Sequence, residues 1–139
     1  MGTKDDRGMA VTEFALVLPL LLLVLFGIIE GGRIFSAWLE ITNDAREGAR
    51  YGVVRTGDPA TEPTLIADVK NFVTSKASGV IDTDPSKFNV TVQIERSPGV
   101  MDVGLTVGVN YKLDIYMPFV QQLLPNPLNL SATSVMRTE

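Results

Sequence analysis

Few residues in this sequence are of types that carry out chemistry. The 139 residues include no cysteine and no histidine. Their absence excludes disulfide bonds, thiolate metal sites and cysteine nucleophiles, and it removes the commonest general base and zinc ligand. We find no nucleophile–base pair, no phosphate-binding glycine loop and no cluster of metal ligands. We therefore expect no enzymatic activity, no cofactor and no metal.

Three carboxylates remain as candidates for a special role. Asp82 and Asp84 lie close together, but nothing follows at the spacing of a calcium loop, which favours a solvated turn. Glu13 stands at the edge of an apolar stretch, where a carboxylate is costly unless it is paired or neutralised, and such residues usually have a function. The alternative is that Glu13 merely lies at the level of the lipid headgroups. The net charge of −4 argues against binding to nucleic acid.

The apolar stretch beside Glu13 predicts a membrane-spanning helix. Residues 14–29 contain no charged or strongly polar side chain. A helix of ~20 residues spans the hydrocarbon layer of ~30 Å, and we expect the span at about residues 10–31. A cleaved secretory signal is the main competitor. It would need a small-residue cleavage site, and the residues that follow (EGGR at 30–33) match one poorly.

The helical pattern continues beyond the span, which predicts one long helix over residues 9–55. Apolar and small residues recur at spacings of three and four and so share one face; they are Ile34, Trp38, Ile41, Ala45, Ala49 and Gly52. Small residues allow a second helix to approach closely. The candidate packing residues are Gly27, Gly31, Ala45, Ala49 and Gly52. A helix of this length either projects into water or bends, and Gly31 with Gly32 is the expected hinge.

The remainder of the chain, residues 56–139, predicts one small α+β domain. Residues 64–78 have the spacing of an amphipathic helix. Residues 87–96, 103–115 and 129–136 alternate apolar and polar side chains, as strands do, with a turn at 97–99 between the first two. We expect a long N-terminal transmembrane helix followed by an extracytoplasmic domain, in which one helix packs on a three-stranded antiparallel sheet.

The segment between the second and third strands, residues 116–125, is unusually apolar for a loop exposed to water. Two interpretations stay open. The segment packs on the sheet of its own domain, or it forms an exposed patch that meets the membrane interface or a partner.

Two motifs in the long helix resemble a known family. Gly8 is followed after four residues by Glu13 and Phe14 and then by the apolar run, and residues 45–50 read AREGAR. Together they resemble the TadE-like family of tight-adherence (Tad) pilus assembly. The resemblance implies that Gly8, Met9, Glu13 and Phe14 form a recognition site for a prepilin peptidase. One departure is Gly31, where family members typically carry an aromatic residue.

The resemblance also implies a function and a place in the cell. It implies a pilin-like structural protein of the cell membrane that crosses it once, with a cytoplasmic N-terminus, although the count of Lys and Arg does not favour that orientation. Its partners would be the bilayer, other membrane proteins contacting the N-terminal helix, other pilins and the peptidase. Cleavage after Gly8 would create an amine at Met9 that could pair with Glu13 of a neighbouring subunit.

The alternative function is an accessory subunit that keeps its polar leader, residues 1–8. Because the sequence retains this leader ahead of the motif, we expect an uncleaved form. Its helix would dock on another membrane protein complex, and no amine at Met9 would be available for pairing with Glu13.

Overall fold

The computed structural model describes residues 3–56, 59–96 and 103–138. In chain order its elements are helix α1 (Thr3–Val53), the short 3-10 helix η1 (Pro59–Thr61), helix α2 (Glu62–Lys76), strands β1 (Phe88–Arg96) and β2 (Val103–Leu113), the short 3-10 helix η2 (Val120–Gln122) and strand β3 (Leu128–Arg137). This arrangement confirms the predicted α+β class, with its long apolar helix, second helix and three strands. The turn predicted at 97–99 lies outside the described residues.

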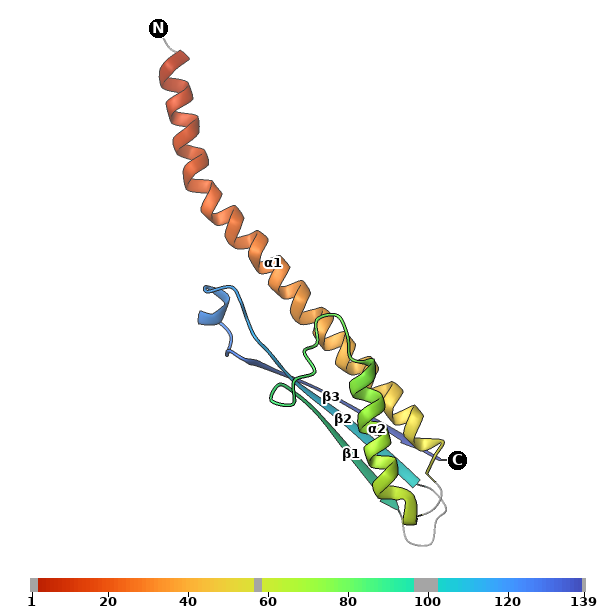
Figure 1. Ribbon diagram of the computed structural model, residues 1–139. Coiled ribbons are helices and arrows are strands. Elements are labelled where there is room, and N and C mark those ends of the chain that lie inside the picture. Colours follow the sequence, from red (N-terminus) through yellow and green to blue (C-terminus); the bar gives the residue numbers. More distant parts are fainter. Residues whose placement is uncertain (1–2, 57–58, 97–102, 139) are drawn as a thin grey trace.

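Helix α1 is continuous over 51 residues, which corresponds to ~75 Å at ~1.5 Å per residue. It includes Pro19 and stays helical without interruption through Gly31 and Gly32, the position of the expected hinge. Figure 1 shows that the N-terminal half of α1 stands away from the rest of the chain and curves gently, whereas its C-terminal half lies along the sheet.

The C-terminal half of α1 is part of the hydrophobic core. Its buried apolar residues recur with the helical period; they are Ala37, Ile41, Ala45 and Ala49. Gly48 and Gly52 lie on the same face and are buried. The prediction that Trp38 belongs to the buried face is wrong, because its side chain is 44% exposed. A helix turns ~100° per residue, and the buried face is centred on Ala37 and Ile41.

The three strands form an antiparallel sheet in the order β1-β2-β3. Leu105 of β2 is opposite Ile94 of β1 and Met136 of β3, so apolar residues from all three strands share one face. Residues on the other face are mainly polar. Since side chains alternate between the two faces of a strand, this pattern leaves one face for the helices and one for water.

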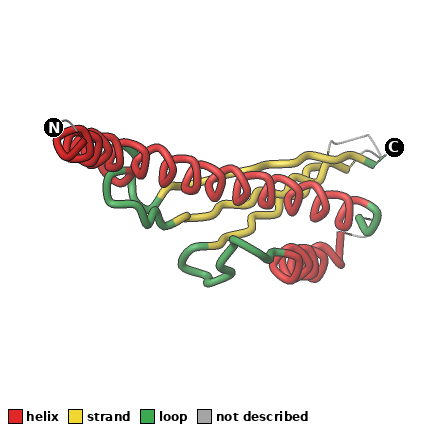
Figure 2. The backbone as a smooth tube through the Cα atoms, turned by 90° about the horizontal axis from the view of Figure 1, so that it is seen from above, coloured by secondary structure: helices red, strands yellow, loops and turns green. Residues whose placement is uncertain are grey.

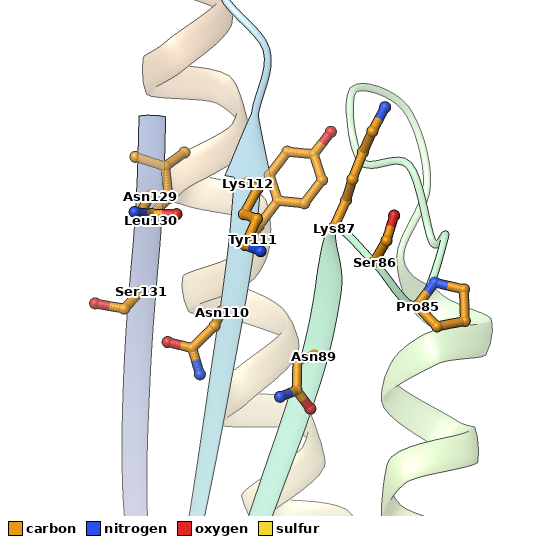
Figure 3. Close-up of a pocket in the computed structure, with 10 residues that line it drawn as sticks. All are labelled: Pro85, Ser86, Lys87, Asn89, Asn110, Tyr111, Lys112, Asn129, Leu130 and Ser131. Atoms are coloured by element: carbon orange, nitrogen blue, oxygen red, sulfur yellow. The ribbon is translucent and has the colours of Figure 1, made fainter. Parts of the chain in front are cut away.

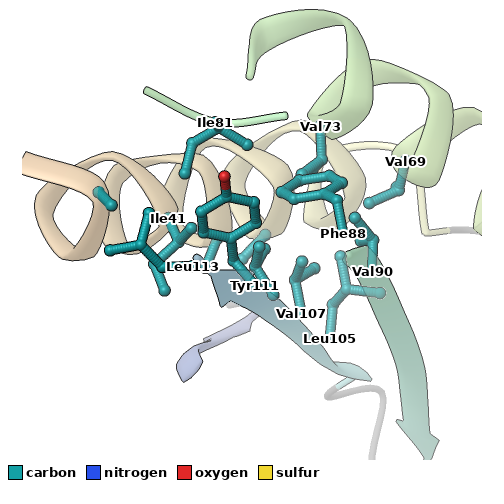
Figure 4. Close-up of a cluster of buried hydrophobic side chains, with 14 of the residues drawn as sticks. Ile41, Val69, Val73, Ile81, Phe88, Val90, Leu105, Val107, Tyr111 and Leu113 are labelled. Atoms are coloured by element: carbon teal, nitrogen blue, oxygen red, sulfur yellow. The ribbon is translucent and has the colours of Figure 1, made fainter. Parts of the chain in front are cut away.

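Both helices cover the apolar face of the sheet. The α-carbon of Gly52 lies so close to the domain that a Cβ there would be 2.2 Å from Leu105 Cδ2 of β2 and 2.9 Å from Val69 Cγ2 of α2. Figure 4 shows Ile41 of α1 and Val69 of α2 in one cluster with inward residues of the sheet. The sequence predicted that only the second helix, α2, packs on the sheet. The structure adds α1, which packs against β2 and β3, while α2 packs against β1.

Candidate functional site

The N-terminal half of α1 exposes a continuous apolar surface. Its large apolar side chains from Met9 to Ile29 face outward; they include Phe14, Leu16, Leu20, Leu21, Leu25, Ile28 and Ile29. Among the described residues, α1 is the one helix that is long and apolar enough to cross a membrane. Only 6% of its most apolar stretch is buried. A core helix of a water-soluble domain buries most of its apolar residues. The helix could therefore span a bilayer.

The residues assigned to peptidase recognition lie together near the start of this surface. Gly8, Met9, Glu13 and Phe14 are all exposed on α1. The hydroxyl of Thr12 donates a hydrogen bond of 2.9 Å to the carbonyl oxygen of Gly8. The motif is thus accessible on the helix surface. Its role as a recognition site stays a prediction.

The predicted packing residues fall into two groups with different surroundings. Gly27 and Gly31 face open space, since no described atom beyond the adjoining residues and the helix's own backbone lies within 4 Å of a Cβ built on either. Ala45, Ala49 and Gly52 are buried within the chain's own domain. The first pair is therefore open to another helix. Ala45 and Ala49 belong to the buried core, and Gly52 lies against Leu105 of β2 and Val69 of α2.

A cluster of polar and charged residues follows the apolar surface, at its C-terminal end on α1. Glu30 is 2% exposed, and its Oε1 lies 2.6 Å from Nη2 of Arg33. The same guanidinium group donates a hydrogen bond to the carbonyl oxygen of Asp114, just after β2, and lies 4.5 Å from the ring centroid of Tyr116. Arg33 therefore links α1 to the segment between β2 and β3. We call these four residues the base cluster.

An ion-pair network extends from the base cluster to the start of β1. Lys87 Nζ lies 3.0 Å from a carboxylate oxygen of Asp114 and 3.1 Å from one of Asp82. Hydrogen bonds to Asp114 and then to Asp82 raise the pKa of Lys87. Asp84 instead accepts hydrogen bonds from the amide and hydroxyl of Ser86, which lower its pKa. Asp82 and Asp84 thus stabilise the conformation of the turn that was predicted around them.

Sequence reasoning missed the base cluster. It considered Glu30 and Arg33 only as part of a stretch that matches a cleavage site poorly, and it assigned no role to Asp114. One local signal was present, because opposite charges at i and i+3 on a helix can pair. The contact with Asp114 could not be found this way, since 81 residues separate it from Arg33.

A shallow polar hollow of about 400 Å³ lies on the outer face of the sheet near the same end. Figure 3 shows its lining, which includes Lys87, Asn89, Asn110, Lys112 and Ser131. Amide, hydroxyl and ammonium groups of this kind donate and accept hydrogen bonds. The hollow is therefore part of the polar, water-facing side of the sheet.

A membrane-type helix carrying a small α+β domain is the class of protein that these features define. The family model described as TadE-like protein matches residues 8–50. This match confirms the resemblance found in the two motifs, and it points to a Tad pilus-associated protein. A search of curated proteins found no match. A search of solved structures also found none.

Proposed function

We propose that this protein is a membrane-anchored, pilin-like structural component of tight-adherence pilus assembly. The observation that carries the proposal is the division of α1 into two halves. The half up to Ile29 exposes its apolar side chains, while the half from Ala37 onward forms part of the domain core. Because the helix is continuous, a single element joins the membrane anchor directly to the core of the domain.

The proposed arrangement places the leader in the cytoplasm and the domain outside it. The apolar half of α1 would cross the bilayer, and the base cluster would lie at the headgroup level, where paired charges cost little. Gly27 would face the hydrocarbon and Gly31 the headgroup region, and both would let a helix of another subunit approach closely. We assign the protein no catalytic role, because its residues supply surfaces for lipid and for other helices.

Protease digestion tests the orientation. Protease added to intact protoplasts should digest the domain from Thr56 onward and leave a membrane-protected fragment that contains the apolar half of α1. Permeabilised cells supply the control for protease activity. A domain that is protected in intact protoplasts and digested after permeabilisation would reverse the orientation.

The second candidate is an uncleaved accessory subunit that docks by α1 on another membrane complex. The open positions at Gly27 and Gly31 fit this function equally well, because no described residue covers them. The two candidates differ in the N-terminus of the native protein. Sequencing that finds Met9 at the terminus supports the pilin-like function, and a terminus at Met1 or Gly2 supports the docked subunit.

A further inference from the structure

The loop that joins β2 to β3 presents apolar side chains to its surroundings. We call residues 115–127 the apolar loop; it contains no charged residue. Leu123 is 80% exposed, Tyr116 68% and Leu124 37%. Exposed Leu and Tyr side chains on one uncharged loop indicate a surface that contacts something less polar than water.

The loop uses its polar groups to hold its own shape. The side-chain amide of Gln121 donates a hydrogen bond of 2.5 Å to the carbonyl oxygen of Ile115, and the amide N–H of Ile115 donates one of 3.0 Å to Oδ1 of Asn126. Ile115 and Val120 are buried beneath it. These bonds tie the two ends of the loop together, so the outward position of Leu123 is a property of a defined structure.

The position of the loop along α1 is set by the base cluster. Arg33 bonds to the carbonyl oxygen just before the loop and stacks on Tyr116 at 4.5 Å. Arg33 is also four residues beyond Ile29, the last of the exposed apolar residues of the span. Figures 1 and 2 show the loop beyond the end of the sheet and beside the middle of α1, on the side of its N-terminal half.

We propose that the apolar loop inserts into the interfacial layer of the same bilayer that α1 spans. The proposal rests on the membrane anchoring in the proposed function. Tyr is enriched at the interface because its ring is amphipathic, and an interfacial element buries its apolar side chains ~5–10 Å into the boundary between headgroups and acyl chains. The loop has both features, and Arg33 holds it beside α1 just beyond the uncharged run of residues 14–29.

A lipid surface explains the loop better than a second copy of the chain does. The exposed apolar residues of the loop lie beside α1, and Arg33 links the loop to α1 just after the apolar run ends. A bilayer covers both at once. The loop would then give the domain a second attachment point beside α1, which fixes the tilt of the domain relative to the membrane.

Single-cysteine labelling tests this insertion on the full chain. The natural sequence has no cysteine, so Leu123→Cys, Leu16→Cys and Val135→Cys each provide one labelling site. All three positions are exposed, and the substitutions leave the core intact. Val135 is the matched control, an exposed apolar residue on the outer face of the sheet at the far end of β3. Each variant is labelled with the fluorophore NBD in vesicles of phosphatidylethanolamine and phosphatidylglycerol.

Quenching by aqueous iodide and by lipids carrying a nitroxide near the headgroup separates the outcomes. We expect the label at 123 to be quenched by the nitroxide lipid and shielded from iodide, with a blue-shifted emission, while the label at 135 is quenched by iodide. A label at 123 as open to iodide as that at 135, with the label at 16 shielded, overturns the insertion and leaves the anchoring by α1 intact.

Two further outcomes overturn the proposal for other reasons. If the label at 16 is itself quenched by iodide, α1 does not enter the bilayer and the proposed function fails as well. If the label at 123 is shielded only at high protein-to-lipid ratios, a second copy covers the loop. Shielding that persists when the protein is diluted in lipid supports insertion.

Discussion

Asp44 is a buried carboxylate whose removal should change the pH dependence of stability. It lies on α1 and is 7% exposed, and its Oδ2 has no hydrogen-bond partner among the described residues. Its pKa is raised from 3.8 to about 6, mainly by burial and also by the nearby carboxylates of Glu40 and Glu47, while Lys76 of α2 partly offsets the rise. Asp44 is not among the residues whose spacing predicted the shared face of this helix, so its burial was not predicted.

The sign of the effect follows from proton linkage. The folded state holds a proton on Asp44 more tightly than the unfolded chain, so its contribution to stability is fully present below about pH 4 and is lost as the pH rises through about 6. A difference of about two pKa units corresponds to ~3 kcal/mol. The variant Asp44→Asn has no carboxyl proton to lose, so it should lack this loss of stability with rising pH.

The measurement compares the free energy of unfolding of the two proteins at several pH values. Urea titrations of the full chain in a non-ionic detergent can follow Trp38, the one tryptophan, on the domain half of α1. Any cost of an unpaired amide in the variant is independent of pH. The stability of Asp44→Asn relative to wild type should therefore rise by ~3 kcal/mol between about pH 4 and pH 8.

The exposed Asp68 on α2 supplies the matched control. It is the same residue type on the surface of the same domain, so Asp68→Asn should follow the wild-type pH dependence. A difference in stability between Asp44→Asn and wild type that does not change between about pH 4 and 8 would refute the reasoning.

Further predictions concern the two ends of the long helix. Gly52→Leu should destabilise the domain by at least ~1–3 kcal/mol, because even its Cβ would lie 2.2 Å from Leu105 Cδ2; Gly27→Leu should leave the thermal midpoint of the domain unchanged, since that position faces open space. In a pilin-like assembly, Gly27→Leu should still weaken cross-linking between helices of neighbouring subunits. Arg33→Met should speed amide hydrogen exchange in residues 114–127, because the loop loses its link to α1. Unchanged exchange there would show that Arg33 does not position the loop.

Periodic and apolar patterns were enough to predict most elements from the sequence. The apolar run ahead of residue 30 indicated a membrane-type helix, since its length and composition alone make it hard to bury in a small domain. The alternation in residues 88–96 and 103–113 likewise indicated two strands, because a half-buried strand repeats every second residue. The family motifs depend on local residues too, and the family match covers residues 8–50.

Tertiary structure alone decided which surfaces those elements share. A helical stripe of small residues shows that something approaches closely, but it does not say whether that neighbour is another subunit or the chain's own sheet. Here Gly52 meets Leu105 and Val69, whereas Gly27 and Gly31 meet no described atom. The link between Arg33 and Asp114 spans 81 residues. Such contacts depend on how the whole chain folds back on α1, which no local spacing encodes.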